Sequence, residues 1–163
     1  MRNVRLGASF MARAPVVSTL NVRGQGMRLV GLVLITLTGL IALAFGVRYI
    51  LTRQFMPYHE AVSGKAWGSL EPRLQAIILG MLKVAAGGFL GYGAALLWLL
   101  VPLSQGASWA PWAVITISLA ALAPVLYVVL WLRRIQSTAK TPVLPTLLAL
   151  SLAVVGAALV WAS

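Results

Sequence analysis

The chain has 163 residues, of which 61% are hydrophobic and 9% charged, with a formal net charge of +11 and no cysteine. Soluble domains are roughly half apolar and about a quarter charged, and a chain of this length cannot bury so many apolar side chains, so its composition excludes a soluble globular protein. The lack of cysteine excludes disulfides, thiolate metal sites and cysteine nucleophiles.

The first 28 residues form a basic segment with five arginines and no acidic residue. Pro15, Gly24 and Gly26 interrupt any helical pattern there, so we expect a disordered tail. The segment has the arginine and serine of a transit peptide, but it lacks an apolar core followed by a small-residue cleavage site. A second interpretation is that translation starts at Met27, where a typical membrane-span sequence begins.

Four long apolar runs make up the rest of the chain, a single membrane domain over residues 29–163. About 20 residues, at 1.5 Å per residue, cross the ~30 Å hydrocarbon layer. A bilayer offers no hydrogen-bond partner to an exposed backbone group, so each run must be helical. The predicted fold is all-α, an integral membrane four-helix bundle. The predicted spans are about 29–51, 74–103, 109–132 and 143–161.

Lysine and arginine near the span ends predict the orientation. Six basic residues lie in the loops after the first and third spans, and none in the loop after the second or at the C-terminus. The N-terminal segment offers three arginines within reach, or Arg28 alone if Met27 is the start. Both counts place loops one and three in the cytoplasm and both termini outside. Spread in this way, the positive charge predicts contacts with anionic lipid headgroups rather than with nucleic acid.

Loop one holds the only histidine, His59, and both carboxylates, Glu60 and Glu71. His59 and Glu60 are adjacent and diverge, Glu71 lies across a turn, and no motif with metal-ligand spacing is present, so we predict no metal site. Haem held by two histidines is excluded, and no G-x-S-x-G motif supplies a serine for a triad. The sequence therefore shows no catalytic constellation and predicts a non-enzymatic protein without a cofactor.

Loop one also carries helix signals. Pro57 begins a short helix that Gly64 ends, and Pro72 begins the second span after Glu71, whose carboxylate meets the positive end of the helix dipole. We expect the short helix to lie in the membrane interface. The aromatic residues predicted to anchor the interfaces are Tyr58, Trp67, Trp109, Trp112 and Trp131.

Lys83 is the only charged residue of the second run. A lysine at the centre of a span costs about 2.5–3.5 kcal/mol and faces protein or a wet cavity. Alternatively, the membrane portion begins at Val84, the ammonium lies at headgroup level, and residues 74–82 extend the helix under loop one. In either case Lys83 lies on the same side as Arg48, His59 and Glu60, which together form a predicted site for a lipid phosphate or an anionic solute.

Small residues form stripes on the second and fourth runs. Gly80, Gly87 and Gly91 lie on one face of the second, and Ala149 and Ala153 on one face of the fourth. Such stripes allow helices to approach closely, either inside the bundle or on a face reserved for another subunit. A phosphate-binding loop is excluded because these glycines lie within an apolar helix with no G-K-[ST] motif.

The stretch MPYHEAVSGKAWGSLEPRLQAIILGMLKVAAGGFLGYGAALLWLLVPL, followed by WAPWAV and a later TP before the last span, resembles a group of small four-span proteins of the bacterial inner membrane. The resemblance covers about residues 27–163 and implies an inner-membrane location but no activity. The layout is also similar to that of DoxX-like subunits of membrane oxidoreductases. This second likeness concerns architecture only, and fold does not imply function.

Three functions are open at this point. The first is an accessory or assembly subunit that contacts other membrane proteins, or itself, through its helices. The second is a small carrier or a lipid- or anion-binding protein that uses Arg48 and Lys83. The third is a membrane oxidoreductase component that contacts a quinone through Tyr58, His59 and Trp67.

Overall fold

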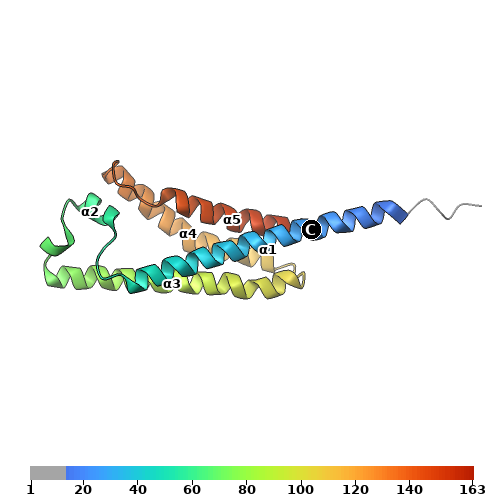
Figure 1. Cartoon of the computed structure of the whole chain (residues 1–163), viewed down its shortest axis with the longest axis horizontal. Coiled ribbons are helices and arrows are strands. Elements are labelled where there is room, and N and C mark those ends of the chain that lie inside the picture. The colour runs from blue at the N-terminus through green and yellow to red at the C-terminus, as the bar shows by residue number, and fades with distance from the viewer. Residues whose placement is uncertain (1–13) are drawn as a thin grey trace, which may run out of the picture.

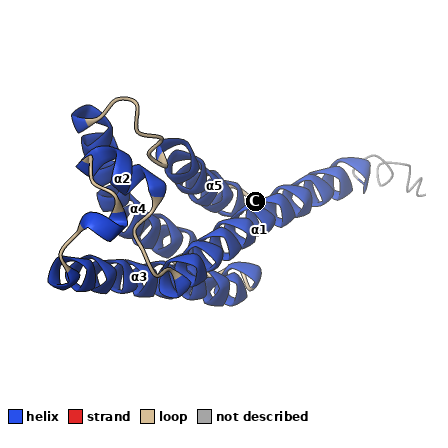
Figure 2. Ribbon diagram, turned by 60° about the vertical axis from the view of Figure 1, so that its left-hand side comes forward, coloured by secondary structure: helices blue, strands red, loops and turns tan. Residues whose placement is uncertain are grey.

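The computed structural model describes residues 14–163, and within them every regular element is helical (Figures 1 and 2). Helices α1, α3, α4 and α5 are each long and apolar enough to cross a membrane. The predicted all-α, multi-pass membrane architecture is confirmed. The elements are α1 (Ala14–Leu51), α2 (Pro57–Ser63), the 3₁₀ helix η1 (Trp67–Ser69), α3 (Pro72–Ser104), α4 (Ala110–Ile135) and α5 (Val143–Trp161).

The N-terminal part of α1 corrects the expectation of a disordered tail through residue 28. The helix runs without interruption from Ala14 through Gly24 and Gly26 into the membrane-spanning part. Pro15 is its second residue, where the missing N–H would have had no intrahelical partner. A glycine costs a helix only about 1 kcal/mol relative to alanine, which a long helix tolerates. The part of the predicted tail before residue 14 lies outside the described residues.

Helix α1 is the centre of the bundle. It packs against α3 and α5, while α4 packs against α5 and, less extensively, against α3. Glycine pairs allow two of these approaches: a Cβ built on Gly156 of α5 would lie 2.9 Å from the carbonyl oxygen of Gly31, and one on Gly93 of α3 would lie 2.7 Å from that of Gly39. The backbones of α1 and its two neighbours therefore touch where only glycine fits.

The two small-residue stripes take different roles. Ala149 and Ala153 of α5 are buried in the core. Gly80, Gly87 and Gly91 of α3 are exposed, and a Cβ built on any of them would meet no heavy atom within 4 Å. Internal packing therefore does not explain the α3 stripe, because this face of α3 points away from the other described helices.

Lys83 of α3 binds the C-terminal end of α1. Its Nζ donates hydrogen bonds to the carbonyl oxygens of Tyr49 at 3.3 Å, Thr52 at 2.8 Å and Ile50. The last carbonyls of a helix lack intrahelical partners and carry the negative end of its dipole. The ammonium satisfies these groups, so Lys83 has a structural role in joining α1 to α3.

Arg28 makes the reciprocal contact at the opposite end of the same helix pair. Its Nη2 donates to the carbonyl oxygen of Leu103 at 2.8 Å and to that of Ser104, both at the C-terminal end of α3. Because α1 and α3 are antiparallel, each helix supplies a cation to the carbonyl end of the other.

The helix signals of loop one are confirmed. Helix α2 begins at Pro57 and ends before Gly64, whose φ of 65° is the left-handed conformation that favours glycine. Helix α3 begins at Pro72, directly after Glu71. Loop one packs on the first turns of α3 through a cluster of buried apolar side chains. These are Phe55, Met56, Leu70 and Leu82, with Tyr49 and Ala86 completing the cluster.

Candidate functional site, an apolar cavity in the bundle

A cavity of about 740 Å³ lies between the helices at the end of the bundle that carries loops one and three. Residues of α1, α3 and α4 form most of its wall, and α2, α5 and residues of loops one and three contribute the rest. The wall is mostly apolar, with Phe45, Leu82, Phe89, Leu122 and Val129 among its side chains. Both the volume, within the range of about 300–1,000 Å³, and the apolar lining are typical of ligand-binding pockets.

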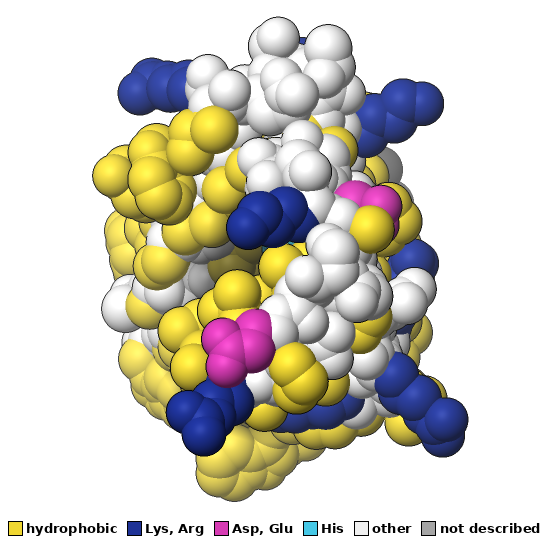
Figure 3. All heavy atoms as spheres, turned by 90° about the vertical axis from the view of Figure 1, so that its left-hand side faces the viewer, with side chains coloured by type: hydrophobic (Ala, Val, Ile, Leu, Met, Phe, Trp, Pro, Cys, Tyr) yellow, Lys and Arg dark blue, Asp and Glu magenta, His cyan; other side chains and the backbone are white. Residues whose placement is uncertain are grey.

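The cavity exists because α3 and α4 diverge from the short turn that joins them. Figures 1 and 2 show the two helices close together at that turn and apart at the other end, where α2 lies. Among the lining residues, Met81 and Ala85 of α3 and Pro124 and Val128 of α4 are exposed. The cavity is therefore open sideways between α3 and α4, toward the space that lipid chains occupy in a membrane. Figure 3 shows a hollow with hydrophobic atoms at this end, with basic side chains around it.

One face of α1 gives the length of the cavity. Thr38, Ala42, Phe45 and Tyr49 line it at helical spacing. Eleven residues separate the first from the last, which at 1.5 Å per residue is about 16 Å. The cavity therefore extends from the end of α1 to about half of the ~30 Å hydrocarbon thickness.

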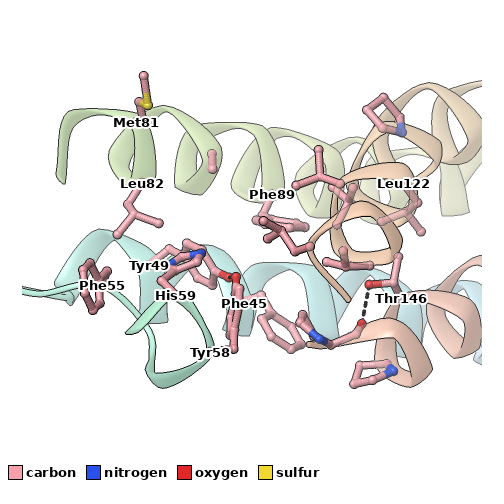
Figure 4. A pocket seen from close by; sticks show the side chains of 18 of the residues that line it. Phe45, Tyr49, Phe55, Tyr58, His59, Met81, Leu82, Phe89, Leu122 and Thr146 are labelled. Atoms are coloured by element: carbon pink, nitrogen blue, oxygen red, sulfur yellow. Dashed lines mark hydrogen bonds between the residues drawn. The ribbon is translucent and has the colours of Figure 1, made fainter. Parts of the chain in front are cut away.

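A group of three polar rings lies at the loop-one end of the cavity (Figure 4). The hydroxyl oxygens of Tyr49 and Tyr58 lie 3.0 Å apart and share a hydrogen bond. The rings of Tyr58 and His59 lie side by side, with centroids 4.1 Å apart. The Nδ1 atom of His59 accepts a hydrogen bond from the backbone N–H of Met56 at 3.2 Å. Helix α2 thus holds two polar side chains against the end of α1.

Burial changes the acid–base behaviour of this group. Desolvation lowers the pKa of His59 below its ordinary value of 6.5. Burial also raises the pKa of Tyr58, with a further contribution from its hydrogen bond to Tyr49. At neutral pH the imidazole and the phenol are therefore both uncharged.

Aromatic packing and one glutamine hold α2 and η1 in place. The ring of Phe55 lies edge-on against Trp67 with centroids 5.0 Å apart, and against His59 at 6.1 Å. The side chain of Gln75 on α3 donates to the carbonyl oxygens of Trp67 at 2.9 Å and Leu70 at 3.1 Å. These contacts fix the histidine relative to α3.

The polar groups deeper in the cavity wall are already hydrogen-bonded within the chain. The hydroxyl of Tyr92 donates to Oγ of Ser118 at 2.9 Å. Thr38 and Thr146 bond to backbone carbonyls of their own helical segments at 2.9 Å and 2.7 Å. The hydrogen-bonding capacity of the cavity is therefore concentrated at its tyrosine–histidine end.

The predicted anion site of Arg48, His59, Glu60 and Lys83 is not assembled, which corrects that prediction. Only His59 lines the cavity. Arg48 and Glu60 are exposed, and Lys83 binds the carbonyl groups of α1, where three oxygens face its three N–H donors. The lysine that does line the cavity is Lys65, an exposed residue of loop one that was not predicted.

The predicted aromatic anchors divide into two groups. Tyr58 bonds to Tyr49 at the cavity instead of standing free in the interface, and Trp67 is half-buried with its ring against Phe55. The other three anchors are exposed near helix ends, as interface anchors require. These are Trp109, Trp112 and Trp131.

The cavity residues Phe45, Tyr49 and Phe89 were not predicted as a site. Phe45 and Tyr49 are four residues apart and so share a face of α1, which is the signal that the sequence offers. No protein-family model, curated protein or solved structure matches this chain. Function must therefore be inferred from the cavity and its polar end.

Proposed function

We propose that this chain is a protein of the bacterial inner membrane that binds a lipid-like molecule in the cavity between α1, α3 and α4. The observation that carries the proposal is the cavity itself: about 740 Å³ of largely apolar space, open sideways between two helices of membrane-spanning length. In an empty cavity of this size the lining atoms would lack van der Waals partners. A hydrocarbon chain from the membrane supplies those partners.

The ligand enters from the side, because exposed lining residues such as Ala85 of α3 and Val128 of α4 lie within the apolar part of the bundle. Its polar end lies near loop one. On the count of positive charges, loops one and three face the cytoplasm. The headgroup of the ligand is then at the cytoplasmic interface and its chain reaches toward the middle of the bilayer.

Two alanines of α3 provide a matched test. Ala85 is exposed and lines the cavity, whereas Ala94 is exposed and does not. Nine residues separate them, which is two and a half helical turns, so they lie on opposite faces of α3. We expect Ala85→Trp to remove most of the lipid that co-purifies with the protein in mild detergent, measured by extraction and mass spectrometry, while Ala94→Trp retains it. Equal retention by both variants would argue against ligand binding in the cavity.

A second function, an accessory or assembly subunit, is favoured by the exposed stripe of Gly80, Gly87 and Gly91 on α3. In membranes, small residues at a helix surface let another helix approach closely. Gly87→Leu should then release a partner, or a second copy, that elutes with the wild-type protein in mild detergent, and leave ligand binding intact. A wild-type protein that elutes as a monomer without a partner would contradict this second function.

A further inference from the structure

We infer that the ligand carries an uncharged, hydrogen-bond-accepting headgroup, a carbonyl of the kind present in alkyl quinones and in neutral glycerolipids, bound by His59 and the Tyr49–Tyr58 pair. The inference rests on the proposed function, because it names the chemical class of the molecule that occupies the cavity. Three features of the polar end support it: the proton position on His59, the spare proton of the tyrosine pair, and the lack of a buried cation among the described residues that line the cavity.

The hydrogen bond from Met56 fixes the tautomer of His59. Its Nδ1 accepts the N–H of Met56, so this nitrogen carries no proton. Since burial keeps the pKa of the imidazole below 6.5, the ring is neutral at pH 7 and its single proton lies on Nε2. Nε2 makes no hydrogen bond to the described residues. His59 therefore presents a free N–H donor at the cavity wall.

The tyrosine pair supplies a second donor. Tyr49 and Tyr58 share one hydrogen bond, in which either hydroxyl can be the donor. Each hydroxyl has one proton, so the hydroxyl that accepts this bond keeps its own proton for another acceptor. The polar end of the cavity therefore combines an N–H and an O–H donor, both neutral.

The basic side chains near the cavity do not favour an anionic headgroup within it. Lys83 is bonded to the carbonyl oxygens of α1, and Arg48 is exposed and outside the lining. Lys65 lines the cavity but is exposed. A buried phosphate or carboxylate would need a cation paired with it away from water. Two neutral donors suit a carbonyl oxygen, which needs hydrogen bonds and no counter-charge.

The remainder of the cavity suits an apolar chain attached to this headgroup. Phe89 lies near the tyrosine–histidine end, with ring centroids 5.8 Å from Tyr49 and 6.2 Å from Phe45. Beyond these rings the wall continues to Thr38. The polar side chains of that part, Thr38, Tyr92 and Thr146, are already hydrogen-bonded to other described residues. The polar end and the apolar length match a molecule with a short neutral head and at least one hydrocarbon or isoprenoid tail.

Two substitutions of His59 separate the headgroup contact from the fold. His59→Gln places an amide N–H near the position of Nε2, whereas His59→Asn is shorter: it keeps an acceptor for the N–H of Met56 but places no donor at that position. The probes are decylubiquinone, dioleoylglycerol and dioleoylphosphatidylglycerol, titrated onto the delipidated full chain. Size-exclusion chromatography and thermal unfolding report whether each variant folds. The double variant Tyr49→Phe/Tyr58→Phe replaces His59→Asn if the latter does not fold.

We expect at least one carbonyl probe to bind the wild type and His59→Gln with similar Kd, and to bind His59→Asn about five- to tenfold more weakly, the effect of one lost hydrogen bond. Arg48→Gln removes a positive charge outside the cavity lining and should leave that Kd unchanged. The tighter of the two carbonyl probes identifies the quinone or the glycerolipid as the source of the carbonyl.

The inference is overturned if phosphatidylglycerol alone binds and Lys65→Gln weakens it, or if a carbonyl probe binds wild type and His59→Asn equally. In both cases a lipid still occupies the cavity and the proposed function stands. If no probe binds and Ala85→Trp has no effect on co-purified lipid, the proposed function fails as well.

Discussion

At the scale of single residues, Lys83 shows how one charge is accommodated in an otherwise apolar helix. Its ammonium lies at the end of α1, where it satisfies carbonyl oxygens of Tyr49, Ile50 and Thr52. Sequence alone placed this lysine at the correct end of the bundle but interpreted it as a ligand-binding residue. The contact partner is remote in sequence, so only the packed structure shows that the charge is already occupied.

Replacing Lys83 with methionine removes this contact while keeping a long apolar side chain. We expect Lys83→Met to lower the free energy of unfolding by about 1–3 kcal/mol, because carbonyl groups at the end of α1 lose their donor. Arg73→Met, at an exposed position in the first turn of the same helix, serves as the control and should have little effect. Unfolding in mixed detergent measures both. Equal stability of the two variants would contradict the structural role of Lys83.

His59 gives the polar end a dependence on pH. Its pKa is lowered in the folded state, so the unfolded chain binds the proton more tightly. The stability that the neutral ring contributes is present above pH 6.5, the ordinary pKa of histidine, and is lost as the pH falls through the lowered pKa of the folded state. A protonated ring carries a proton on Nδ1 and cannot accept the N–H of Met56. Amide protection factors in α2 should therefore fall between about pH 7 and pH 5 in the wild type, and much less in His59→Gln. An identical fall in both proteins would exclude His59 as the cause.

At the scale of elements, the helices were predictable and their faces were not. Four runs of apolar residues are long enough, as helices, to cross the hydrocarbon layer, and they determine the four spans. Pro57, Gly64 and Pro72 determine the short helix and the start of α3. In a membrane, however, the lipid-facing side of a helix is as apolar as the packed side, so periodicity does not distinguish them. This is why the sequence could not decide whether Gly80 and Gly87 pack inside the bundle or, as the structure shows, lie on an exposed face.

Two glycines test the assignment of faces. We expect Gly156→Ala to lower the free energy of unfolding by about 1–3 kcal/mol, because the new methyl would lie 2.9 Å from the carbonyl oxygen of Gly31. Gly87→Ala should leave it unchanged or raise it by up to about 1 kcal/mol, since alanine is the better helix former and the site is open. The same unfolding assay compares them. A larger loss for Gly87→Ala would mean that the packed and exposed faces are reversed.

At the scale of the whole molecule, the number of spans follows from the sequence, whereas the cavity does not. The cavity arises because α3 and α4 diverge while α1 holds α3 and α5, a property of contacts between segments far apart in the chain. No local pattern encodes such divergence. The sequence suggested Tyr58, His59 and Trp67 of loop one as contacts for a quinone, but it could not show that Tyr49 of α1 joins Tyr58 and His59 at the cavity.

The orientation of the whole molecule is open to a direct test, because the chain contains no cysteine. Ser69 in loop one and Ser108 in the α3–α4 turn are both exposed. Because loops one and three hold more basic residues, we expect a membrane-impermeant thiol reagent to label Ser108→Cys but not Ser69→Cys in intact spheroplasts. Labelling of Ser69→Cys alone would reverse the orientation.

Occupation of the cavity in a membrane is measured most directly by photolabelling. A photoreactive alkyl probe, incorporated into vesicles with the full-length protein, reacts with the side chains that it contacts, and mass spectrometry locates the labelled peptides. We predict that label concentrates on cavity residues such as Phe45 and Phe89, exceeds that on the outward-facing Trp98 and Leu144, and falls in Ala85→Trp. Label spread evenly over the outer surface, with none in the cavity, would contradict the proposal that this protein binds a lipid-like ligand.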